Sequence, residues 1–201
     1  MHGLQVVATD GPDSVEFTEL PDPTGDALVV DVRAAGVGFP DLLMARGEHQ
    51  IRRPVPFTLG WEAAGVISAA PDDSRFKEGE EVVTLTLGSF AEKVAAVPEA
   101  TFPKPPGLSW EQAAAFPMNY LTALAGLQRR GRLREDETVL VHGAAGGTGT
   151  AAIQVAKSLG ARVIGVVSGD AKEMVARAAG ADEVFRSDGP WEDEVVEFSG
   201  G

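Results

Sequence analysis

Cysteine is absent from this chain of 201 residues. Without thiols the protein cannot form disulfides, cannot use a cysteine nucleophile, and cannot hold iron–sulfur clusters or thiolate-bound zinc. Histidine is scarce as well, with three residues in the whole sequence. The composition therefore excludes thiol chemistry and cysteine-ligated metal sites before any motif is considered.

Basic residues are few, and long apolar runs are missing. The chain has 17 Lys and Arg against 30 Asp and Glu, for a net charge of −13. A nucleic-acid groove needs concentrated positive charge to displace counterions from phosphates, so we expect no nucleic-acid partner. No apolar run reaches the ~18 residues that a membrane helix needs, and the first residues lack the pattern of a secretory signal. We expect a cytoplasmic protein with no membrane partner.

The first half of the chain has the pattern of a small all-β domain. Short apolar runs broken by glycine and proline predict a barrel or sandwich. The expected strands are residues 4–8, 15–20, 27–33, 65–69, 81–87 and 90–97. Phe39, Leu42, Leu43 and Arg46 follow helical spacing, which predicts a helix over 39–46. Four prolines between 98 and 107 predict an extended crossing with no regular element.

The second half alternates strands and helices. Ser109-Trp-Glu-Gln112 matches a capping box, Pro117 is expected to interrupt the helix that follows, and 119–130 is expected to restart it. Beyond these the expected strands are 138–142, 162–167 and 182–185, and the expected helices are 150–159, 171–179 and one beginning at Pro190. This alternation indicates parallel pairing. It amounts to one half of a doubly wound dinucleotide-binding fold, which contains two such halves.

A glycine turn joins the first of these strands to its helix. In His142-Gly-Ala-Ala-Gly-Gly-Thr-Gly149, Gly146 would let the backbone approach a pyrophosphate, and Gly149 would let the helix pack close on the strand. The helix start would offer free N–H groups and a partial positive charge. The alternative is a tight turn without a ligand. The candidate cofactor-binding residues here are Ala145, Gly146, Gly147, Thr148 and Gly149.

The end of the second strand indicates which cofactor is held. Ser168 and Gly169 stand where an NAD-preferring site usually has a carboxylate for the ribose 2′-hydroxyl. Lys172, one turn further on, can pair with a 2′-phosphate, so NADPH is favoured over NADH. Asp170 is a carboxylate close to this position and would argue against NADPH. We interpret it as the N-cap of the helix that follows.

The motifs together resemble a known family. The runs that carry the resemblance are 139–149, 152–157, 160–164, 39–41, 46–47, 54–57, 60–62, 64–66, 90–92 and 118–123. In order along essentially the whole chain, they are similar to the quinone oxidoreductase (zeta-crystallin-like) branch of the medium-chain dehydrogenase/reductase superfamily. The resemblance implies a GroES-like N-terminal barrel domain over 1–125 and a partial Rossmann NADP-binding domain over 126–201. Family members continue beyond this point, so the chain is expected to be truncated at its C-terminal end, and a homodimer is expected only when that part is supplied.

The resemblance also implies an activity without zinc. Zinc-dependent relatives place a cysteine in the segment matching Gly38 and a histidine in the segment matching Trp61, and neither ligand is present here. Without a Lewis acid, hydride transfer from NADPH suits an electron-poor acceptor, a quinone or a conjugated enone. Thr122, in the family's Thr-Ala pair, is expected to be a further cofactor contact; alternatively, its hydroxyl bonds the backbone of its own helix.

Three positions depart from the family's pattern. The family usually has Asn at Gly38 and often Tyr at His49, and a Tyr often follows the third strand, where Arg186 and Ser187 stand. No catalytic residue is assigned; His49 is a candidate that can hydrogen-bond a carbonyl, although it can equally be a solvated loop side chain. Arg186 is either a partner of the 2′-phosphate or an ordinary surface charge. Asp41 is expected to support its helix, and Gly38 favours the alternative function, a non-catalytic module that binds NADPH or a protein partner.

Overall fold

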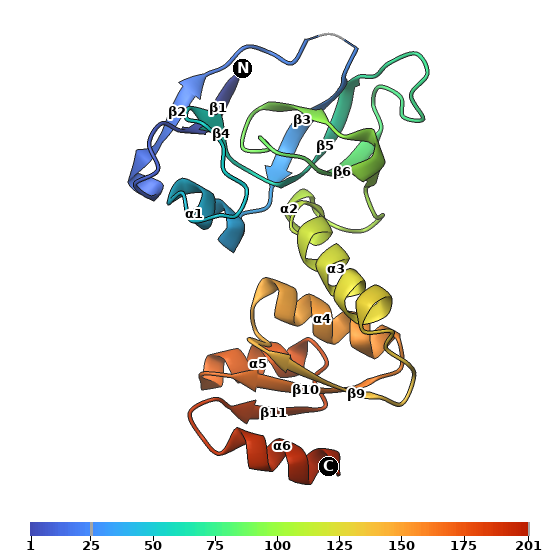
Figure 1. Ribbon diagram of the computed structural model, residues 1–201. Coiled ribbons are helices and arrows are strands. Elements are labelled where there is room, and N and C mark those ends of the chain that lie inside the picture. Colours follow the sequence, from blue (N-terminus) through green and yellow to red (C-terminus); the bar gives the residue numbers. More distant parts are fainter. Residues whose placement is uncertain (25, 201) are drawn as a thin grey trace. The chain divides into compact units, whose positions relative to one another are not determined.

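The computed structural model describes residues 1–24 and 26–200 (Figure 1). The chain forms two compact units, Met1–Met118 and Asn119–Gly201. Each unit has its own buried apolar clusters, as expected for separately packed domains. None of the helices in the described ranges is long and apolar enough to span a bilayer.

The first unit contains two antiparallel sheets. The three-stranded sheet has the order β2-β1-β4, with β1 His2–Val6, β2 Val15–Glu19 and β4 Phe57–Thr58. The five-stranded sheet has the order β7-β3-β5-β6-β8, with β3 Leu28–Ala35, β5 Glu62–Ala69, β6 Glu81–Leu85, β7 Lys93–Ala96 and β8 Thr101–Pro103. A single bridge between Gly3 and Ala91 joins them. The expected GroES-like β domain is confirmed, and its described strands form two linked open sheets instead of one closed barrel.

Apolar side chains on alternate strand positions make the core of this unit. Val30, Ile67 and Val82 are at most 1% exposed and pack together on one face of the five-stranded sheet. A second cluster joins Met44 and Phe57 under helix α1. The helical elements here are η1 Pro12–Ser14, α1 Phe39–Ala45, η2 Pro98–Ala100 and α2 Trp110–Ala114.

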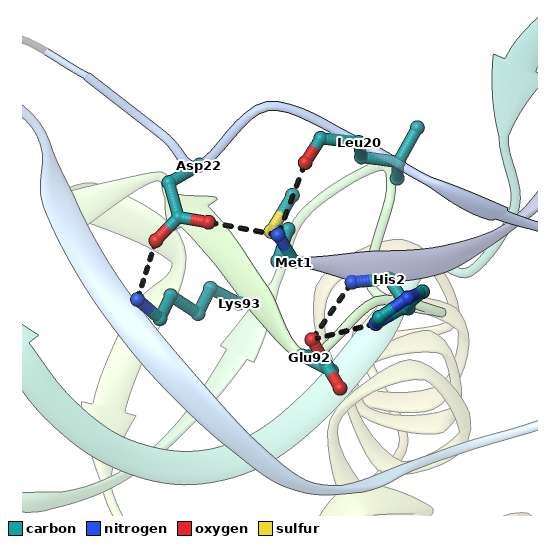
Figure 2. Close-up of polar contacts among 6 residues, drawn as sticks. All are labelled: Met1, His2, Leu20, Asp22, Glu92 and Lys93. Carbon is teal, nitrogen blue, oxygen red and sulfur yellow. Dashed lines mark hydrogen bonds and ion pairs between the residues drawn. The ribbon is translucent and has the colours of Figure 1, made fainter.

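Polar contacts fasten the N-terminal strand to the rest of its unit (Figure 2). The Met1 ammonium donates to the carbonyl oxygen of Leu20 at 3.1 Å and to Oδ1 of Asp22 at 3.0 Å. Asp22 also accepts from Nζ of Lys93 at 2.5 Å, and this hydrogen bond lowers the pKa of the Asp22 carboxyl. The Asp22–Lys93 pair is solvent-exposed, so we expect it to contribute little to stability.

The proline-rich crossing was predicted wrongly. It contains the turn η2 and the strand β8, and β8 pairs with β6 through Val82 opposite Pro103. Pro98 lies in the first turn of η2, and Pro103 is the last residue of an edge strand. At both places a missing N–H costs no ladder hydrogen bond, which explains why the prolines did not prevent regular structure.

The second unit is a three-stranded parallel sheet with helices. Its order is β11-β10-β9, with β9 Thr138–His142, β10 Arg162–Val167 and β11 Glu183–Arg186. Its helices are α4 Gly147–Ser158, α5 Asp170–Ala178 and α6 Trp191–Ser199. Val141, Ile153 and Val163 are at the centre of its core. The expected first half of a Rossmann sheet is confirmed.

Helix α3, Phe116–Leu124, carries the chain from the first unit into the second and continues as the π-helical segment η3, Ala125–Arg130. The capping box at Ser109 and Gln112 is confirmed by reciprocal hydrogen bonds of 3.2 and 3.0 Å. Pro117 does not delay the next helix to residue 119, because as the second residue of α3 it lies where a helix needs no N–H donor.

Candidate functional site

The glycine turn after β9 is built around a close backbone approach. A Cβ on Gly149 would overlap the carbonyl oxygen of Gly143 and lie 2.9 Å from the Cα of Ala144. Gly143 itself has φ of 62°, in the left-handed region that favours glycine. The helix can therefore start directly against the end of the strand, as expected for Gly149.

Helix α4 begins at Gly147, ahead of the predicted start at residue 150. Gly146 is its N-cap in extended backbone, and the first backbone hydrogen bond of the helix runs from the N–H of Thr150 to the oxygen of Gly146 at 2.8 Å. The N–H groups of Gly147, Thr148 and Gly149 precede that bond and have no carbonyl acceptor within the helix. They make the amino end of α4 suited to a negatively charged group.

A cavity of about 340 Å³ lies at the carboxyl ends of the parallel strands. Its lining comes from the end of β9, the glycine turn, the end of β10, the first turn of α5 and the residue after β11. The lining residues are His142, Gly143, Ala145, Gly146, Val166, Val167, Ser168, Lys172 and Ser187. In open parallel sheets this edge is where ligands bind.

Four of the residues proposed from the sequence meet in this cavity: Ala145, Gly146, Ser168 and Lys172. Gly147, Thr148 and Gly149 form the adjoining first turn of α4, and Gly169 is the N-cap of α5. Thr148 donates through its hydroxyl to Oδ1 of Asn119 at 3.0 Å. Thr122 is exposed on α3 and is not part of the cavity lining, so the structure does not bring it to this site.

Lys172 reaches the end of β10 from the first turn of α5. Its Nζ donates to Oγ of Ser168 at 2.8 Å, and both side chains line the cavity. An ammonium group has three donors, and the hydrogen bond to Ser168 engages one of them. The sequence-based pairing of Ser168 with Lys172 at one site therefore agrees with their positions.

The interpretation of Asp170 as an N-cap was wrong. Helix α5 starts one residue earlier than predicted, so Gly169 is the N-cap and Asp170 is the first helical residue. The Asp170 carboxylate instead accepts from Nη1 of Arg186 at the end of β11. Arg186 also contacts Asp188 through Nη2 at 3.2 Å. Two carboxylates thus engage the arginine that the sequence offered as a partner for a 2′-phosphate.

Sequence reasoning missed several lining residues. His142, Val166 and Val167 end strands β9 and β10, and Ser187 follows β11. The rule that ligands gather at the carboxyl ends of parallel strands would have found all four. The ring of His142 also makes an edge contact with Trp191 of α6, with centroids 4.8 Å apart.

In the first unit, Asp41 supports helix α1 and the loop beside it. The side chain is 5% exposed, and its oxygens accept from the N–H of Gly38 at 2.8 Å and the N–H of Gly60 at 3.2 Å. Burial raises the pKa of the carboxyl, which these two hydrogen bonds only partly oppose. The expected structural role of Asp41 fits this geometry.

Glu62 is a second buried carboxyl, at the start of β5. It is 5% exposed, and Oε2 accepts from the N–H of Met118 at 2.7 Å. Burial raises its pKa to about 7, and the nearby charge of Asp41 acts in the same direction. No local pattern signals this perturbation, because it depends on what packs around the strand.

His49 lies in the loop after α1, beside Trp61. Its Nδ1 accepts from the N–H of Ile51 at 3.1 Å, and the two rings are 5.3 Å apart. The ring lines a cavity of about 180 Å³ in the first unit. In the described residues no three His, Asp or Glu side chains gather into a possible metal site.

Comparison with known proteins agrees with this architecture. Residues 24–106 match the model of the alcohol dehydrogenase GroES-like domain, and residues 147–201 match the model of the zinc-binding dehydrogenase family. Quinone oxidoreductase-like protein 2 of Rattus norvegicus is 37% identical over 205 residues, which cover 99% of this chain and 59% of that protein.

Solved structures give the same result. A probable oxidoreductase from Mycobacterium abscessus is 44% identical with a TM-score of 0.94, over 100% of this chain and 66% of that one. The quinone oxidoreductase from Thermus thermophilus, which was also solved in complex with NADPH, is 36% identical with a TM-score of 0.86, over 100% and 64%. The chain thus spans about three-fifths of the length of these relatives. It belongs to the medium-chain dehydrogenase/reductase superfamily and is a quinone oxidoreductase-like member of it.

Proposed function

We propose that this chain provides the NADPH site and the acceptor side of a zinc-independent oxidoreductase that transfers hydride to a quinone or a conjugated enone. The observation that carries the proposal is the cavity at the carboxyl ends of β9 and β10, which both the glycine turn and Lys172 line. We assign residues 126–201 to the NADP-binding domain and 1–125 to the substrate-side domain. By family resemblance, we propose a cytoplasmic homodimer for the whole protein.

The described residues fit NADPH at both of its charged groups. The amino end of α4 has three N–H groups without helical acceptors, which suit a pyrophosphate. A Cβ on Gly146 would meet only the oxygen of Gly143, at 3.3 Å, so the open side of this residue faces space where a ligand can approach. Lys172, oriented by Ser168, supplies a positive charge for the 2′-phosphate. When bound, the cofactor supplies the hydride, and these residues bind and orient it.

Zinc independence is supported by residue types in the first unit. Glycine at 38 and tryptophan at 61 offer no metal ligand where zinc-dependent relatives have cysteine and histidine. The matched family is described as zinc-binding, but its model covers residues 147–201 and does not reach either position. A catalyst without a Lewis acid must rely on how it places the hydride donor against the hydride acceptor. An acceptor that readily takes up negative charge, such as a quinone or a conjugated enone, is therefore favoured.

The proposal is tested by adding acceptors to the purified chain with NADPH and following the loss of NADPH absorbance. We expect turnover with a quinone or an enone, none with a simple ketone, and no change when a chelator is present. Oxidation of NADPH that a chelator abolishes would contradict zinc independence. Tight NADPH binding with no turnover of any acceptor would contradict the catalytic part of the proposal.

A non-catalytic module that binds NADPH or a protein partner is the second candidate, and Gly38 favours it. The family's usual asparagine is missing from the N-cap of α1, where Gly38 has an ordinary extended conformation. A Cβ there would meet Cδ of Pro40 at 3.2 Å, a contact that a small shift relieves. If Gly38→Asn creates turnover that the native chain lacks, this second function is favoured for the native chain.

A further inference from the structure

The cavity of about 180 Å³ in the first unit has a lining that combines positively charged and apolar side chains. The nitrogen-bearing side chains are those of His49, Arg52 and Arg53, in the loop between α1 and β4. Met44, Ile51 and Phe57 line it with apolar surface. These six residues and Gly47 all lie between positions 44 and 57, and Thr9 completes the lining.

The nitrogen groups of this cavity are hydrogen-bond donors, and the hydroxyl of Thr9 can donate or accept. His49 accepts the N–H of Ile51 at Nδ1, so its neutral ring carries the proton on Nε2 and can donate there. Each guanidinium group has five donors and no acceptor. A lining of donors with two full positive charges selects a ligand that accepts hydrogen bonds and carries negative charge.

Arg52 and Arg53 are exposed side chains whose charges are not neutralised by an ion pair in the described residues. Within residues 1–24 and 26–200, the paired cationic side chains are Lys93, Lys104, Lys157, Arg177 and Arg186, with His2 beside Glu92. Neither Arg52 nor Arg53 has an ion-pair partner in those ranges, although acidic residues outnumber basic ones by 30 to 17. The Cζ of Arg53 lies 5.7 Å from the centre of the Phe57 ring, which holds the guanidinium beside the apolar wall.

We propose that this cavity binds an oxyanion, a carboxylate or a phosphate, carried on an apolar body. Arg52 and Arg53 contact the oxyanion, His49 donates a further hydrogen bond, and Met44, Ile51 and Phe57 contact the adjoining apolar carbons. At about 180 Å³ the cavity is smaller than a typical whole-ligand site of roughly 300–1,000 Å³, so it takes one end of a molecule. The role of this cavity as an anchor for an acidic acceptor rests on the proposed function. Its ability to bind an anion does not depend on that function.

The test measures binding without turnover. Tryptophan fluorescence of the 201-residue chain is titrated with cinnamate, cinnamamide and phenyl phosphate, because the ring of Trp61 lies 5.3 Å from that of His49. We expect cinnamate or phenyl phosphate to bind, and whichever binds more tightly identifies the oxyanion. Cinnamamide has the same shape without the charge and is expected to bind at least about tenfold more weakly.

Three double variants assign the site. Arg52→Ala with Arg53→Ala is expected to weaken anion binding at least about tenfold, from the loss of two charge-assisted contacts. Arg33→Ala with Lys77→Ala removes the same charge from exposed positions of this unit outside the cavity, and is expected to leave binding unchanged. If the Arg52→Ala/Arg53→Ala variant does not fold, the Arg52→Lys/Arg53→Lys variant is used. It keeps both charges but loses the planar guanidinium groups, so it should still weaken anion binding.

The outcomes separate this proposal from the function above. Equal binding of cinnamate and cinnamamide would overturn the anion site. Equal weakening of anion binding by the Arg52→Ala/Arg53→Ala variant and the Arg33→Ala/Lys77→Ala variant would overturn it as well. NADPH binding with no arginine-dependent anion binding would overturn it as well and leave the proposed cofactor site intact. Arginine-dependent anion binding by a chain that does not bind NADPH would support the anion site and contradict the cofactor proposal.

Discussion

Nζ of Lys172 donates a hydrogen bond to Oγ of Ser168 across 2.8 Å, and both side chains line the cavity at the end of β10. If this pair holds the 2′-phosphate, Lys172→Glu replaces an attraction by a repulsion for NADPH and not for NADH. We expect NADPH to bind at least about tenfold more weakly, the size of one charged hydrogen bond. Dissociation constants of both nucleotides, measured by calorimetry, check this prediction.

The matched control is Lys77→Glu, which makes the same charge change at an exposed residue of the other unit. It is expected to leave both dissociation constants unchanged. If Lys172→Glu weakens NADPH and NADH equally, Lys172 does not contact the 2′-phosphate.

The negative charge of Asp170, in the first turn of α5 two residues before Lys172, should oppose NADPH binding. The Asp170 carboxylate is 93% exposed and engages Arg186, the residue before Ser187, which lines the cavity. Asp170→Asn keeps the size of the side chain, removes that charge and loosens Arg186. NADPH is expected to bind a few-fold more tightly while NADH changes little, since exposed charge pairs are worth about 1 kcal/mol or less. In an Arg186→Ala background the gain should shrink; a gain of the same size there would show that Arg186 takes no part.

Gly149 is expected to be indispensable to the fold of the second unit. A Cβ at this position overlaps backbone atoms of Gly143 and Ala144, which cannot move aside as a flexible side chain would. Gly149→Ala should lower the free energy of unfolding of this unit by at least about 2 kcal/mol, as overpacking does. Gly126→Ala is the control, because a Cβ there meets nothing within 4 Å. Equal stability of the two variants in urea denaturation would contradict the close approach.

The pH dependence of stability should report the buried carboxyl of Glu62. Its pKa is raised from 4.5 to about 7 by burial, so the folded state keeps a proton that the unfolded state has already lost. Its contribution to stability is complete below pH 4.5, falls as the pH rises from there to about 7, and is constant above. The loss is at most about 3–4 kcal/mol, at about 1.36 kcal/mol for each pKa unit between 4.5 and about 7.

Glu62→Gln removes this titration while its amide oxygen can still accept from the N–H of Met118. The free energy of unfolding of the variant relative to the native chain should therefore rise between pH 4.5 and about 7. Urea denaturation across that range measures the difference. A difference that stays constant with pH would show that Glu62 does not titrate there.

Periodicity and glycine signals predicted the second unit closely. Strands β9 and β10 have the expected bounds, because continuous apolar runs flanked by turn residues leave little freedom in where a buried parallel strand begins and ends. Helix starts were less predictable. Glycines at 147 and 149 have low helix propensity, yet both are helical because the close contact with Gly143 and the hydrogen bond to Gly146 hold them there.

Contacts between residues distant in the sequence were beyond sequence reasoning. The pairing of Asp170 with Arg186 joins α5 to the end of β11, and the hydrogen bond of Glu62 to Met118 joins β5 to α3. Neither leaves a local pattern. Ala145 and Gly146 in the cavity lining were predicted because the glycine motif has a fixed spacing. Ser168 and Lys172 were predicted because the ribose of a dinucleotide lies at the end of the second strand, whereas Thr122 was inferred from resemblance alone.

The most direct test of the account is a calorimetric titration of the 201-residue chain with NADPH and, separately, with NADH. The account predicts that NADPH binds the more tightly of the two, through the amino end of α4 and Lys172. Failure of both nucleotides to bind at millimolar concentration, or tighter binding of NADH, would contradict it.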